Sequence, residues 1–286
     1  MRSLLFILCT TLAACHAGVQ TEQRKDSSAT GIVADTLYED PKGLKDAPAD
    51  AWEPNTDSLM DIVSTEALSY AGKHLQDGDY QYEFELFPGM YSIKTAMAFG
   101  HLFETGKSHL HIRSSAETGN VLDNVYLLEN NHFKLISTDT IAYLEFTSDS
   151  IGDVNGDKLR DYMVVTYSSS GCCLRYVYNV YTYNASTGGF SHLYNFYNPD
   201  FFPEEKVVRG VGYGHPGEVE LYKFKWNDTV LETIERIYRD PENDKQFIRM
   251  RGEDSGEPSS RNGEVLNAVP KEYRNIDGYE WFMYEE

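Results

Sequence analysis

Apolar and polar residues alternate along most of the chain beyond Gly78, which is the pattern of β-strands with one buried face. In QYEFEL at 81–86 the three apolar side chains fall on the same face. Many short strands separated by turn residues predict a mainly β fold of antiparallel meanders, either propeller-like or a sandwich. The predicted strands are 91–103, 108–113, 124–128, 132–137, 140–146, 162–167, 174–183, 190–196, 206–211, 218–226 and 229–238.

The segments outside these strands set the expected domain organisation. Apolar residues at helical spacing behind a capping box at Ser58–Asp61 predict one N-terminal helix over about 58–75. Residues 15–55 have few apolar residues and no periodicity, which predicts a flexible tether. Residues 239–262, with two prolines and two glycines, are predicted mostly as loop. We therefore expect a mainly β domain over 56–286.

The first fifteen residues, MRSLLFILCTTLAAC, have the features of a secretory signal. Their apolar run is too short to cross a bilayer, which takes about 20 apolar residues. LAAC at 12–15 resembles the lipobox of bacterial lipoproteins, in which cleavage before the cysteine leaves a diacylated residue. The resemblance implies a signal peptide over 1–14, lipidation of Cys15 and a location in the bacterial cell envelope, anchored by lipid to the outer membrane. The alternative is an ordinary secretory signal with a chance cysteine.

The charge of the chain narrows the classes of partner. There are 45 acidic and 25 basic residues, which give a formal net charge of −20. Such a surface repels nucleic acid and anionic lipid headgroups and attracts basic proteins and cations. We therefore exclude a nucleic-acid function, expect membrane contact through the N-terminal lipid only, and take a basic protein as the candidate partner.

Two cysteines follow Cys15 in the chain, the neighbours Cys172 and Cys173. They cannot join distant parts of the fold to each other. A vicinal disulfide would close a strained ring, because neighbouring Cα atoms lie only about 3.8 Å apart. The sequence leaves a vicinal disulfide and a reduced pair as alternatives.

The segment GDVNGDKLRD at 152–161 places oxygen-bearing side chains at alternate positions. Calcium takes six to eight oxygen ligands, and a short loop supplies them best from every second residue. The alternative is a polar turn without an ion, because Asp, Asn and Gly are common turn residues. The candidate calcium ligands are Asp153, Asn155, Asp157, the backbone carbonyl of Leu159, and Asp161.

This pattern, D-x-N-x-D-x-x-x-D running into a strand, resembles the calcium loops of FG-GAP and integrin-type propeller repeats. That family usually places glycine at position six, where the chain needs a positive φ. This sequence has Lys158 there and Gly156 at position four. A lysine in the left-handed region costs about 1 kcal/mol, and its ammonium group would lie near the ion.

Residues 149–240 as a whole, about a third of the chain, resemble a group of bacterial lipoproteins built as small calcium-bound pseudo-propellers. Some members of that group are immunity proteins that block peptidoglycan hydrolases delivered by rival cells. The resemblance implies calcium as the cofactor and a binding or inhibitory role against a basic cell-wall hydrolase.

Three other sets of residues bear on a metal-binding, ligand-binding or catalytic function. His109 and His111 lie two apart on a predicted strand and point to one face, as in a zinc pair, but a third ligand is not evident, and a solvated strand face is the alternative. The tyrosines at 176 and 178 and those at 181 and 183 fall on opposite faces, so one pair could form a sugar- or protein-binding face. No serine–histidine–acid motif occurs, yet abundant Asp and Glu keep a glycan- or peptide-processing envelope enzyme as the alternative function.

Overall fold

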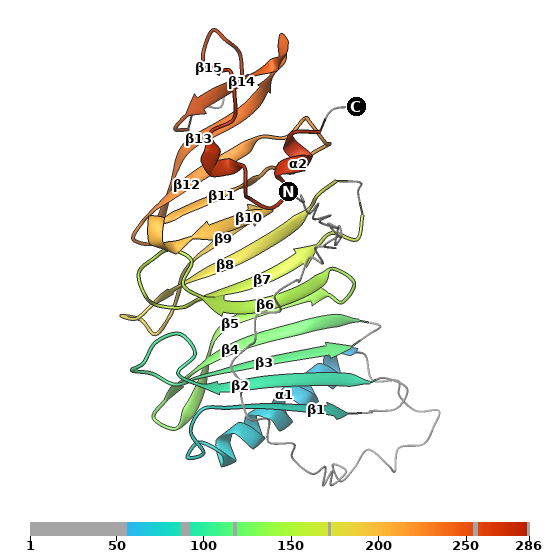
Figure 1. Cartoon of the computed structure of the whole chain (residues 1–286). Helices are drawn as coiled ribbons and strands as arrows, with labels where there is room; N and C mark the ends of the chain where they lie inside the picture. Colours follow the sequence, from blue (N-terminus) through green and yellow to red (C-terminus); the bar gives the residue numbers. More distant parts are fainter. Residues whose placement is uncertain (1–55, 87–91, 117–118, 171–172, 254–256, 285–286) are drawn as a thin grey trace, which may run out of the picture. The chain divides into compact units, whose positions relative to one another are not determined.

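The computed structural model describes residues 56–86, 92–116, 119–170, 173–253 and 257–284, with side chains from residue 59 onward. This part of the chain forms three antiparallel sheets, and each strand pairs with its neighbours in sequence (Figure 1). The predicted mainly β fold of antiparallel meanders is therefore confirmed, as is the N-terminal helix, which runs from Thr56 to Lys73 (α1). The propeller-like or sandwich arrangement stays a prediction.

The first sheet has one face under α1 and the other face turned toward the second sheet. Leu110 and Ile112 of β3 pack in one buried cluster with Ala67 and Ala71 of α1. Side chains alternate along a strand, so His109, His111 and Arg113 lie on the other face. The strands are β1 (Tyr80–Leu86), β2 (Ile93–Gly100), β3 (His109–Ala116), β4 (Asn120–Glu129) and β5 (His132–Ala142).

The second sheet shares a buried core with the first. Phe103 and Val125 from the first sheet region pack with Tyr162, Val164 and Tyr183 of the second. Chain segments far apart in the sequence are thereby brought together at this junction. The strands are β6 (Phe146–Gly152), β7 (Asp161–Tyr167), β8 (Tyr176–Asn184) and β9 (Gly189–Tyr197).

The third sheet packs its core against both the second sheet and the C-terminal segment. Phe196 of β9 lies in one buried cluster with Val208 and Trp226, while Tyr273 and Phe282 cover Leu221 and Ile237. The strands are β10 (Pro199–Phe202), β11 (Val207–Val211), β12 (Leu221–Asn227), β13 (Val230–Asp240), β14 (Asn243–Arg251) and β15 (Glu264–Leu266), with short helices η1 (Pro203–Glu205), η2 (Lys271–Tyr273) and α2 (Tyr279–Phe282).

The prediction that 239–262 is mostly loop missed a strand, because β13 continues to Asp240 and β14 spans Asn243–Arg251 within this range. Pro241 lies in the tight turn between β13 and β14, where Asp240 pairs with Asn243, so it does not interrupt a strand. Phe247 and Ile248 of β14 are then buried in the sheet. Of the breaker residues, Pro241 and Gly252 therefore lie just outside the two ends of β14.

Candidate functional site

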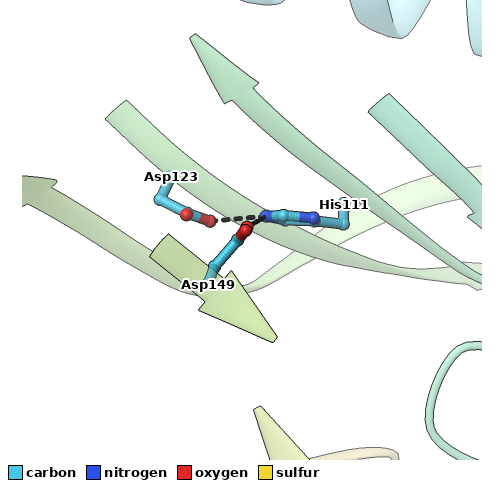
Figure 2. Close-up of side chains that lie close together, drawn as sticks. All are labelled: His111, Asp123 and Asp149. Atoms are coloured by element: carbon cyan, nitrogen blue, oxygen red, sulfur yellow. Dashed lines mark hydrogen bonds and ion pairs between the residues drawn. The ribbon is translucent and has the colours of Figure 1, made fainter. Parts of the chain in front are cut away.

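One imidazole and two carboxylates meet where the first and second sheets face each other. His111 Nε2 lies 2.8 Å from Asp123 Oδ1 and 3.2 Å from Asp149 Oδ2. Figure 2 shows both carboxyl groups turned toward the ring, and the three ligand atoms lie within 4.8 Å of one another. Within the described residues, this is the group of His, Cys, Asp or Glu ligand atoms that gathers closely enough to hold one metal ion.

Strand register explains how the sequence brings these residues together. Arg113 of β3 pairs with Asp123 of β4, so Asp123 lies diagonally across from His111 on the same sheet face. Asp149 comes from β6 of the second sheet. The sequence pointed to His111 through its spacing from His109, whereas nothing local to Asp123 or Asp149 distinguishes them from the other 43 acidic residues among the 45 in the chain.

The cluster is largely buried, and one of its two carboxylates is paired with an arginine. The side chain of Asp123 is 0% exposed, and its Oδ2 has no hydrogen-bond partner. Arg113 forms an ion pair with Asp149 Oδ1, which leaves Asp149 Oδ2 to face His111. Two carboxylates are thus faced by one guanidinium and one imidazole.

Tyr162 closes the cluster from the second sheet. Its hydroxyl lies 3.1 Å from His111 Nε2, and the residue is fully buried. Burial, followed by the nearby charges of Asp123 and Asp149, raises the pKa of Tyr162 well above its ordinary value. The phenol therefore stays neutral and offers its O–H to the cluster.

An open cavity of about 480 Å³ lies beside the cluster. Asp149 and its ion-pair partner Arg113 line this cavity, so the cluster borders solvent on the side of Asp149. The remaining lining is mixed polar and aromatic and comes from Ser115, Tyr143, Phe146, Thr147 and Ser148. Chemically, this arrangement can place a carboxylate, oriented by an arginine, next to a small polar ligand or a bound cation.

His109, the other histidine of the predicted zinc pair, has a different role. Its Nε2 lies 3.1 Å from the Tyr183 hydroxyl, and its ring packs edge-on against Phe103. Burial lowers the pKa of His109 to about 4. Asp123 and Asp149, rather than His109, lie beside His111, and His109 is a neutral core residue.

The predicted calcium loop connects β6 to β7 and is held by bonds to its own backbone. Asp153 accepts the N–H groups of Gly156 and Lys158, at 2.6 and 2.9 Å. Lys158 has a φ of 73°, the left-handed conformation expected for position six. Gly156 also has a positive φ, and a side chain there would collide with the carbonyl of Pro203. The loop is therefore tightly turned at both positions.

The side chains of this loop match calcium in their chemical type. Carboxylates and an amide are ligands that calcium prefers, and Asp157 accepts the N–H of Leu159 at 2.8 Å while Asn155 accepts that of Asp157. Asp161 points inward, where its two oxygens accept the N–H groups of Val154 and Tyr183 and burial raises its pKa to about 7. Among the described side chains, the three aspartates of the loop do not form a group of converging ligand atoms.

Several predictions fall on segments outside the described residues. These are the signal peptide at 1–14, lipidation of Cys15, the tether at 15–55 and the vicinal disulfide, because Cys172 lies in an undescribed gap. Cys173 is buried, with its Sγ 3.8 Å from His215 Nδ1. In the described part of the chain, no helix has the length and apolar character needed to span a membrane.

Of the four predicted tyrosines of β8, Tyr176 at its start is 39% exposed, and the others are packed into buried clusters. Tyr178 contacts the core shared with the third sheet, and Tyr183 is buried against the first sheet. A further exposed aromatic surface lies at the end of β9, where Tyr197 and Tyr213 are 44% and 49% exposed with ring centres 5.5 Å apart. Leu193 and Asn195 share the Tyr197 face of β9 and are also exposed. We call Leu193, Asn195, Tyr197 and Tyr213 the Tyr197 surface.

Comparisons of the chain with protein-family models, with curated proteins and with solved structures found no match.

Proposed function

We propose that this protein is a binding protein of the bacterial cell envelope, anchored by lipid at Cys15, that engages and inhibits a basic cell-wall hydrolase. The observation that carries the proposal is the exposed Tyr197 surface on a chain with a net charge of −20. The resemblance of 149–240 to immunity lipoproteins supports the same class of partner.

The Tyr197 surface has the composition of a protein interface. Tyrosine is enriched in interfaces because it combines a large contact area with a polar tip. The side chain of Asn195 is held by a hydrogen bond to Asn179, which fixes the polar part of the surface before a partner arrives. Electrostatic attraction between an acidic protein and a basic enzyme accelerates their encounter and selects against acidic partners.

Removing the two exposed rings should weaken inhibition. The double variant Tyr197→Ala, Tyr213→Ala is expected to raise the protein concentration needed to block lysis of purified cell wall by at least about tenfold. Tyrosines that become buried when a partner binds are common interface hot spots. A panel of basic lysozyme-like hydrolases serves as the assay. Tyr284→Ala is the matched control, since this tyrosine is 50% exposed and lies outside the Tyr197 surface. Unchanged lysis and no complex with any hydrolase would contradict the proposal.

Calcium is proposed as the ion that stabilises the 153–161 loop. At a hundredfold excess over its dissociation constant, an ion that binds only the folded state adds about 2.7 kcal/mol to the free energy of unfolding. Asp153→Asn should abolish this gain, and Lys158→Gly should increase it by relieving a positive φ and removing a nearby charge. Thermal melts of chelated protein with and without added calcium provide the measurement. Identical midpoints would make the loop an ordinary polar turn.

A second candidate function is an envelope enzyme that processes glycans or peptides. The observation that favours it is the cavity whose lining includes Asp149, backed by the buried pair His111 and Asp123. Product formation from a glycan or peptide library, lost in Asp149→Asn, would favour this function over binding alone.

A further inference from the structure

We propose that His111, Asp123 and Asp149 form a binding site for a divalent transition-metal ion of the zinc type, separate from the 153–161 loop. This inference does not depend on the proposed inhibitory function, because none of the three residues belongs to the Tyr197 surface.

The spacing of the ligand atoms is close to that of a metal site. Zinc bound at about 2.0 to 2.2 Å by tetrahedral ligands holds those ligands about 3.4 Å apart. His111 Nε2 lies 2.8 Å from Asp123 and 3.2 Å from Asp149. The distance from His111 Nε2 to Asp123 Oδ1 would have to lengthen by about half an ångström to admit the ion, and all three ligand atoms lie within 4.8 Å of one another.

The buried oxygen of Asp123 is the second observation that points to a ligand. A fully buried carboxylate is costly unless both of its oxygens are paired or one coordinates a metal. Asp123 Oδ1 is bonded to His111, but Oδ2 has no hydrogen-bond partner, and Figure 2 shows this carboxyl group directed into the cluster. Asp149 Oδ2 likewise has only its ion-pair contact with His111. Each carboxylate thus keeps an oxygen for an ion.

The mixed ligand set decides the class of metal. Calcium and magnesium prefer oxygen ligands throughout, whereas an imidazole favours zinc and its transition-metal neighbours. Three protein ligands would leave a fourth position, as in catalytic rather than structural zinc sites. Asp149 lines the 480 Å³ cavity, so that position would be reached from the cavity.

Two surrounding residues would orient the ligands. Arg113 is paired with Asp149 Oδ1 and holds the carboxylate so that Oδ2 faces His111. The Tyr162 hydroxyl, 3.1 Å from His111 Nε2, can bond to a ligand oxygen or to water on the ion. Such partners fix ligand geometry and commonly change metal affinity by about ten- to a hundredfold.

The test is a calorimetric titration of the full chain with zinc chloride. The protein is first freed of metal ions with a chelator, which is then removed. Calcium is then added to saturation, so that the 153–161 loop does not compete for zinc. One zinc per chain is expected. Asp123→Asn and His111→Gln should each weaken binding by about a hundredfold or more. The control is Asp79→Asn, because Asp79 and His101 form an exposed pair at 3.1 Å with no third ligand among the residues that the structure describes. This variant should bind zinc as the unaltered chain does.

A second measurement uses the unaltered chain, so it remains informative if the Asp123→Asn variant does not fold. Cobalt bound to the unaltered chain should give the absorption bands of a four-coordinate site with nitrogen and oxygen ligands, and zinc should displace it. Absence of one-to-one zinc binding would overturn the proposal and leave the cluster as a polar network around the His111 ring. Equal affinity in the unaltered chain and in a folded Asp123→Asn variant would overturn it as well.

Discussion

Acidification from pH 8 to pH 4 is expected to lower the free energy of unfolding by about 3 kcal/mol through His109 alone. Burial lowers the pKa of this histidine from 6.5 to about 4 in the folded state. Its contribution to stability is therefore fully present above pH 6.5, where the ring is neutral in both states. Below that value the unfolded chain takes up a proton that the folded chain refuses, and the contribution is lost as the pH falls toward 4.

Other groups also titrate over this range, so the measurement is a difference between variants. Urea unfolding at a series of pH values, with chelator present, should give a shallower decline for His109→Gln than for the unaltered chain. His101→Gln is the matched control, because His101 is largely exposed and lies at the end of the same hairpin. Parallel curves for His109→Gln and the unaltered protein would show that the ring is not held neutral by its contacts with Tyr183 and Phe103.

Local patterns in the sequence predicted the parts of the fold that depend on local chemistry. The predicted strands 124–128 and 132–137 are separated at Asn130 and Asn131, and both residues have a positive φ between β4 and β5. The alternation in β3 correctly placed His109 and His111 on one face. Periodicity is set by backbone geometry within a single strand, so it can be recognised without knowing what the strand packs against.

Contacts between sheets could not be predicted in the same way. The strand pattern did not show that the face with His109 and His111 is covered by Tyr162 and Tyr183 of another sheet. It therefore left a solvated strand face as an alternative. Asp123 depends on the register of β3 with β4, and Asp149 on the approach of β6. Both are long-range features, and a composition with many acidic residues conceals them.

Replacement of Phe103 by alanine is expected to lower the free energy of unfolding by about 3 to 5 kcal/mol, the range for removal of a buried phenylalanine side chain. Phe103 lies in the connection between β2 and β3 and is fully buried. Its ring stacks on Tyr183 at 5.3 Å and meets Phe190 edge-on at 5.2 Å, so it joins the first sheet to two strands of the second. Its carbonyl accepts the N–H of Arg160, a residue of the 153–161 loop, at 3.0 Å.

The loss should come from the cavity left between the sheets, because alanine retains the backbone bond to Arg160. Phe103→Leu fills part of that cavity and is expected to cost less than Phe103→Ala. Leu144→Ala is the surface control: this leucine is 81% exposed, and its removal should change stability by less than about 0.5 kcal/mol. Urea unfolding followed by far-ultraviolet circular dichroism measures all three variants. A cost for Phe103→Ala as small as that of the control would mean that the ring does not hold the two sheets together, and the junction that positions His111 against Asp149 would then rest on the polar contacts alone.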